Sequence, residues 1–120
     1  MKVHIGPYRK NRATRVEIEP HDTWSMDHTL AMIIHPMLVQ LKATQQGWPA
    51  NLTEERWDEI LDEMIWAFDY KAKDIDTGDM CRDKCSNFAD PVCKACLDDV
   101  QERLTNAFTL FGKYYESLWN

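Results

Sequence analysis

The chain has 120 residues, of which 44% are hydrophobic and 28% charged, and its formal net charge is -6. This length suits one domain that folds around its own core without disulfide bonds, and the composition is ordinary for a globular protein and does not indicate disorder. The excess of acidic residues argues against a general affinity for nucleic acid, whose phosphates must be met by Lys and Arg.

Residues 1–20 predict a β-hairpin with a long basic tip. Residues 3–5 and 15–18 alternate apolar and polar, which is typical of half-buried strands. Residues 1–15 hold five basic residues and no acid, so the rest must sum to -11 for the total to be -6. We interpret the tip as solvated, with contact to a phosphate or an acidic partner as the alternative. Two strands are marginal alone, so we expect the hairpin to pack on a helix.

Residues 22–44 predict a first helix, in which apolar residues recur at helical spacing: Met26, Leu30, Ile33, Ile34, Met37, Leu38 and Leu41. The opposite face carries His28, Met32, His35 and Val39. The stretch from His28 to Leu41 contains no Asp, Glu, Lys or Arg. A helix that is apolar on both sides is usually buried on both sides, so we expect this helix to be the central one.

Residues 53–71 predict a second helix, with Thr53 as its N-cap and acidic residues in its first turn. Its expected core stripe is Trp57, Ile60, Leu61, Met64, Ile65 and Phe68.

Residues 90–119 predict the last helix, in which apolar residues form a heptad-like seam from Leu97 to Leu118. About 28 helical residues would span ~42 Å, more than this domain needs to cover its core. We therefore expect part of the helix to contact a protein partner or another copy of the chain. Aromatic residues are enriched in interfaces, and the expected interface residues are Trp66, Tyr70, Tyr114, Tyr115 and Trp119.

All four cysteines lie within residues 81–96, just before and inside the start of the last helix. The pattern C-x3-C-x7-C-x2-C, formed by Cys81, Cys85, Cys93 and Cys96, suits a tetrahedral four-thiolate zinc site. Such a site has no open position for substrate, so we expect structural zinc. Two disulfides, an iron–sulfur cluster and four free thiols remain as alternatives.

A second set of residues offers a catalytic alternative. Acids on one helix can hold magnesium above a diphosphate, and residues three or four apart share a helix face. A metal-dependent hydrolase, or a protein that sequesters a small phosphorylated, nucleotide-type ligand, would use Asp22, Asp27, His28, Glu59 and Glu63. The purely structural interpretation is that Asp22, Asp27 and His28 cap the start of a helix and that Glu59 and Glu63 belong to a solvated acidic face.

Four segments resemble a family of small proteins encoded by tailed bacteriophages: Gly6-Pro7-Tyr8, residues 22–30 (DTWSMDHTL), residues 61–68 (LDEMIWAF) and residues 111–115 (FGKYY). The resemblance covers about two thirds of the chain and leaves out the cysteine segment. It implies expression inside a bacterial host and does not imply any activity.

The basic start has no apolar run typical of a signal peptide, and no stretch approaches the ~20 apolar residues of a membrane span. We therefore expect the host cytoplasm.

Together these patterns predict a mainly α protein of one domain. We expect an N-terminal β-hairpin packed on a three-helix bundle, with a short cysteine-rich loop, bound to zinc, before the last helix. The expected function is non-enzymatic binding of a host or viral protein, or self-association into a homo-oligomer. Nucleic acid and membranes are not expected as partners.

Overall fold

The computed structural model describes residues 1–73 and 91–119, with side chains from 1–73 and 97–119. It opens with an antiparallel hairpin of β1 (Lys2–Ile5) and β2 (Thr14–Glu17), in which Val3 pairs with Val16 and Ile5 with Thr14. The tip is closed by a backbone hydrogen bond of 2.8 Å from Gly6 to the carbonyl of Ala13. The predicted hairpin is confirmed.

Two helices occupy the region predicted as one. The short α1 (Pro20–Trp24) begins with proline in its first turn, where the missing backbone N–H costs nothing. Ser25 then separates it from α2 (Met26–Thr44), because its backbone leaves the helical region. Pro36 lies inside α2.

The next helix, α3 (Glu54–Ala72), begins as its sequence predicts. The Thr53 hydroxyl accepts a hydrogen bond of 3.1 Å from the backbone N–H of Arg56, and acids fill the first turn. The predicted core stripe of α3 is buried, with Ile65 half-buried, and α3 also buries Ala67 and Tyr70.

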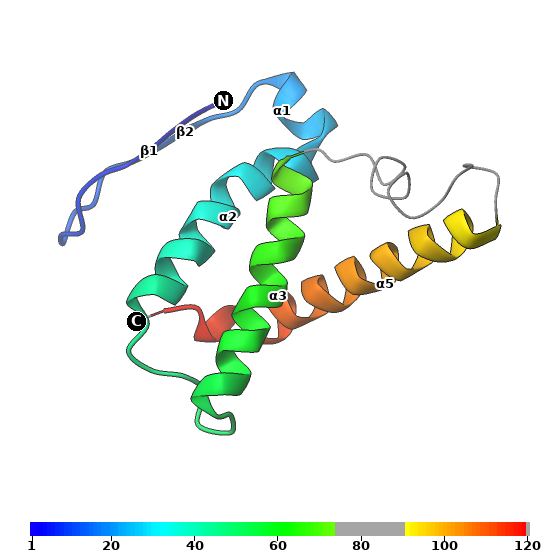
Figure 1. Cartoon of the computed structure of the whole chain (residues 1–120). Coiled ribbons are helices and arrows are strands. Elements are labelled where there is room, and N and C mark those ends of the chain that lie inside the picture. The colour runs from blue at the N-terminus through cyan, green and yellow to red at the C-terminus, as the bar shows by residue number, and fades with distance from the viewer. Residues whose placement is uncertain (74–90, 120) are drawn as a thin grey trace.

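The last helix, α5 (Pro91–Lys113), ends earlier than the predicted residue 119, and a 3-10 turn, η1 (Tyr115–Ser117), follows it. Tyr114 leaves the helical conformation, so the chain bends back there toward α2 (Figure 1). The seam of α5 faces α3, and its most buried residues are Leu104, Ala107 and Tyr114.

The helices form an open arrangement in which α3 is the middle element. α3 packs against α2 on one side and against α5 on the other. Among the described residues, α2 and α5 do not pack directly on each other (Figure 1). The prediction that residues 22–44 form the central helix is therefore wrong. The physical reason is that α3 has apolar residues on two sides, toward Leu61 and toward Ala67, and so can separate the other two helices.

The outer side of α2 remains exposed as a consequence. Met26, Leu30 and Met37, predicted to be core, are 53%, 40% and 66% exposed. The radius of gyration is 17.4 Å, against about 14 Å for a compact domain of this length. The described chain is accordingly flat and extended, and much apolar surface stays in contact with solvent.

The hairpin is also placed differently from the prediction. It projects from the end of the molecule that carries α1, and none of its described residues packs against a helix (Figure 1). An ion pair of 3.1 Å between the N-terminal ammonium and Asp22 joins its base to α1. The expectation of a hairpin packed on the bundle is therefore wrong. The apolar face that would have packed, around Val3 and Val16, is exposed.

The class is mainly α with an N-terminal two-stranded hairpin. Within the residues described, no helix combines the length and the apolar character that crossing a membrane requires.

Candidate binding groove

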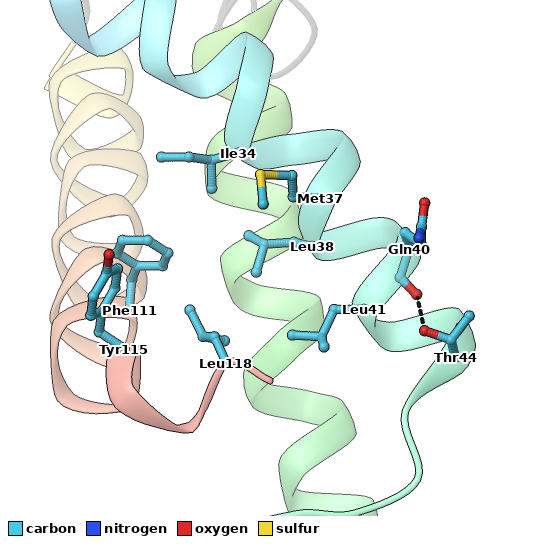
Figure 2. Close-up of a pocket in the computed structure, with 9 residues that line it drawn as sticks. All are labelled: Ile34, Met37, Leu38, Gln40, Leu41, Thr44, Phe111, Tyr115 and Leu118. Carbon is cyan, nitrogen blue, oxygen red and sulfur yellow. Dashed lines mark hydrogen bonds between the residues drawn. The ribbon is translucent and has the colours of Figure 1, made fainter. Parts of the chain in front are cut away.

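An apolar groove lies between α2 and the end of α5, with a volume of about 650 Å³. Figure 2 shows side chains of α2 pointing across it toward those of α5 and the turn that follows. None of its nine lining residues carries a charge; they are Ile34, Met37, Leu38, Gln40, Leu41, Thr44, Phe111, Tyr115 and Leu118.

The α2 wall of the groove follows from the uncharged stretch of the sequence. Leu38 faces α3 and is 3% exposed, whereas Met37, one residue earlier, turns outward and is 66% exposed. The polar groups at the outer rim are Gln40 and Thr44, and the Thr44 hydroxyl donates to the carbonyl of Gln40 at 2.9 Å (Figure 2). The wall thus offers apolar surface with a few neutral hydrogen-bonding groups beside it.

Aromatic rings form the opposite wall. Phe111 contacts Phe68 of α3 edge-to-face, with centroids 4.9 Å apart, and Tyr115 contacts Phe111 at 5.7 Å. Phe111 is therefore held by the core, while Tyr115 is 64% exposed. Leu118 lies between the two walls in Figure 2. The rings give the groove a firm side opposite the flexible methionine.

A smaller hollow of about 290 Å³ lies beside the groove, at the same end of the molecule. The loop after α2 and the tail after η1 form it, with Trp48 on one side and Trp119 on the other. The two rings are 45% and 74% exposed. Exposed tryptophan therefore flanks the groove.

The first two acids of the catalytic alternative are held by neighbours in the structure. Asp22 accepts a 2.7 Å hydrogen bond from the backbone N–H of Glu19, and this bond, with the N-terminal ammonium, lowers the pKa of Asp22. The pKa of Asp27 is also lowered, first by the backbone N–H of His28 and then by Lys71, whose ammonium lies 3.4 Å away. Both arrangements favour the ionised carboxylate.

The other three residues of that set also have partners on neighbouring helices or turns. The ring Nδ1 of His28 lies 2.8 Å from the carbonyl of Lys71; a carbonyl only accepts, so Nδ1 carries the proton. Glu59 pairs with Arg56 one turn away, and Glu63 accepts two hydrogen bonds from Arg103.

These five residues are spread along the molecule. Glu59 lies twelve residues before Lys71 on α3, about 18 Å along the axis from the contacts of Asp27 and His28. None of the five lines the groove. In the part of the chain that the structure describes, no three His, Cys, Asp or Glu residues are arranged to hold a metal ion.

The predicted zinc ligands fall largely outside the described residues. Cys81 and Cys85 lie outside them. Cys93 and Cys96 lie in the first turns of α5, where the structure describes the backbone and not the side chains. Zinc binding by the four cysteines stays a prediction.

The predicted interface residues separate into three groups by exposure. Tyr70 and Tyr114 are 5% and 8% exposed and lie in the core of the chain. Tyr115 and Trp119 are exposed beside the groove and hollow. Trp66 is half-buried under the guanidinium of Arg103, which lies 3.8 Å from its ring centroid.

None of the predicted interface residues belongs to α2, although α2 forms one wall of the groove. The feature of the sequence that indicates this wall is the uncharged stretch from His28 to Leu41, which has more apolar positions than one helix contact can bury. We interpreted that excess as burial on two sides, whereas one of the sides is open.

Comparisons of the chain with family models, with curated proteins and with solved structures give no match.

Proposed function

We propose that this protein acts by binding another protein through the groove between α2 and the end of α5. The observation that carries the proposal is the groove itself, an open apolar surface of nine residues without a charge, flanked by exposed tryptophan. Exposed apolar patches of this kind on a soluble protein mark interaction sites.

The composition of the groove fits a peptide or helix partner. Amphipathic segments lay their apolar side chains into grooves between helices, and methionine adapts to partners of different shape. Met37 and Tyr115, at 66% and 64% exposed, are the most exposed large apolar residues of the lining and so are accessible to such a segment. Because the lining is uncharged, the inserted part of the partner must be uncharged as well.

No arrangement in the described residues favours the catalytic alternative over protein binding. The acids proposed for it form ion pairs that hold the fold, such as Glu63 with Arg103. Their carboxylates do not face the groove, so a phosphorylated ligand in the groove would find no metal ligands there.

A photo-crosslinking amino acid placed at Met37 tests the proposal in living bacterial cells. We expect irradiation to join the protein covalently to another polypeptide, identified by mass spectrometry. The control places the same amino acid at Gln101, an exposed residue of α5 away from the groove. Adducts at position 37 but not at 101 support the proposal, whereas no protein adduct at 37, or equal adducts at both, would contradict it.

A further inference from the structure

The hairpin has an apolar face with nothing to cover it. Val3 and Val16 form a cross-strand pair, and Ile5 and Ile18 lie two residues from them on the same face. These four side chains are 45% to 56% exposed. A two-stranded hairpin is marginally stable in water unless its apolar face packs against something. We refer to residues 1–18 as the arm.

The arm also carries charge opposite to that of the helices. Its first 15 residues have five basic side chains and no acid, whereas Glu54–Glu63 of α3 holds six acids and one arginine, a net of -5. Arg103 and Lys42 each pair with one of these acids, while Glu54 and Glu55 remain exposed in the first turn. The arm and the first half of α3 are therefore electrostatically complementary.

The acidic half of α3 lies level with the groove. Gln45 and Lys42, near the end of α2, bind Asp58 and Asp62 of α3. Leu41 and Thr44, from the same turns of α2, line the groove. These acids therefore lie at the same level along α2 as the groove, outside its lining.

The arm cannot reach the groove of its own chain in this structure. It leaves from the end of the molecule where α2 starts, and in Figure 1 it lies on the side of α2 away from α5. The groove is lined by the second half of α2 and faces α5. An arm seated in this groove would therefore have to come from another copy.

We propose that two copies exchange arms, so that the apolar face of each arm packs in the groove of the other copy. This inference rests on the proposed function and names its partner as a second copy of the chain. The lengths agree, because a four-residue strand spans ~13 Å and the groove from Ile34 to Thr44 spans ~15 Å along α2. The exchange is two-fold symmetric and brings each basic tip to the acidic half of the partner's α3.

Sedimentation analysis of the full chain and three variants tests the exchange. We expect the wild-type protein to sediment at twice its mass of 14.1 kDa, with weaker association at higher salt. Val3→Asp and Met37→Asp each place a carboxylate in the apolar contact and should raise the dissociation constant at least about 100-fold. Val39→Asp is the matched control, because Val39 is 44% exposed, like Val3 at 45%, and lies outside the groove.

A mixture of two variants separates arm exchange from a face-to-face dimer. The Met37→Asp copy keeps an intact arm and the Val3→Asp copy keeps an intact groove, so together they can form one unaltered contact. We expect the mixture to associate more tightly than either variant alone. Both residues are exposed within one copy, so we expect each variant to keep its helices. Circular dichroism measures the helix content of each variant.

Three results would overturn the exchange: a wild-type monomer at all concentrations, a dimer that Val3→Asp does not weaken, or no gain on mixing the variants. The proposed function is judged separately by the crosslink at position 37. A monomer that crosslinks to a different protein removes the exchanged arm and keeps the groove as a binding site. A monomer without any crosslink removes both.

Discussion

The helices α2 and α3 have the same length, 19 residues, but opposite relations between composition and burial. α2 has no charged residue over fourteen positions and buries only Ala31 and Leu38. α3 carries six acids in its first ten residues and buries seven side chains. The arrangement of apolar positions around the axis, more than their number, therefore decides which helix becomes the centre of the fold.

The strongest test of this comparison uses methionine in both helices. Met64 of α3 is 0% exposed and Met37 of α2 is 66% exposed. We expect Met64→Ala to lower the free energy of unfolding by about 2–5 kcal/mol, because it leaves a cavity in the core. Met37→Ala should change it by less than about 0.5 kcal/mol, since its side chain is already in solvent. Urea denaturation measures both.

Similar losses of stability in the two methionine variants would contradict this difference between α2 and α3. At concentrations where arms exchange, Met37→Ala should also weaken association, so the denaturation series needs protein dilute enough to be monomeric.

The contact between α3 and α5 supplies the next largest effect. Arg103 donates two hydrogen bonds, of 3.0 and 3.1 Å, to Glu63, and its guanidinium stacks on Trp66. We expect Arg103→Ala to lower the free energy of unfolding by about 1 kcal/mol. The effect is small because the side chains of Arg103 and Glu63 are both partly exposed to solvent. Arg103→Lys should recover less than half of the loss, because an ammonium cannot form the paired hydrogen bonds.

Hydrogen exchange of residues 97–107 reports this contact directly. The exchange should accelerate in Arg103→Ala and not in Gln101→Ala, which changes an exposed residue on the same helix. Equal protection in both variants would show that the apolar residues alone hold α5 on α3.

A histidine contact ties the start of α2 to the end of α3. His28 donates to the carbonyl of Lys71 at 2.8 Å, whereas Nε2 of His35 lies 3.6 Å from the Asp69 carboxylate. We expect His28→Ala to cost about 1 kcal/mol and His35→Ala less, because only the first is a well-formed hydrogen bond between half-buried groups. Thermal unfolding at pH 7 ranks the two, and a larger loss for His35→Ala would reverse the assignment.

Sequence patterns predicted several local features of the described residues correctly, although not the break at Ser25 or the end of α5. The alternation around Val3 and Val16 indicated the hairpin, and the hydroxyl of Thr53 indicated the start of α3. The stripe from Trp57 to Phe68 indicated the core, because spacing along one helix determines which residues share a face. These signals depend only on residues close in sequence.

Long-range placement could not be predicted in the same way. The period of α2 shows which residues share a face, and it does not show whether another helix covers that face. Met37 and Leu38 are both apolar neighbours, yet only Leu38 is buried, because α5 turns away from α2 and leaves the groove open. The hairpin was misplaced for the same reason, since an apolar strand face indicates a need for cover and not its source.

The smallest expected effect concerns the ion pair between Asp27 at the start of α2 and Lys71 at the end of α3. The pKa of Asp27 is lowered by the backbone N–H of His28 and by Lys71, so ionised Asp27 stabilises the folded chain. A lowered folded pKa gives a contribution that is complete above the ordinary value of 3.8 and is lost as the pH falls through the folded value. We expect Asp27→Asn to lower the melting temperature slightly at pH 7, and this deficit should shrink as the pH falls below 3.8 and the wild-type carboxylate becomes protonated. Because the carboxylate is exposed, the difference should also shrink in high salt. A deficit that stays constant as the pH falls would mean that Asp27 acts through a contact other than its charge, and the start of α2 would then be held to the end of α3 by the His28 hydrogen bond and by packing alone.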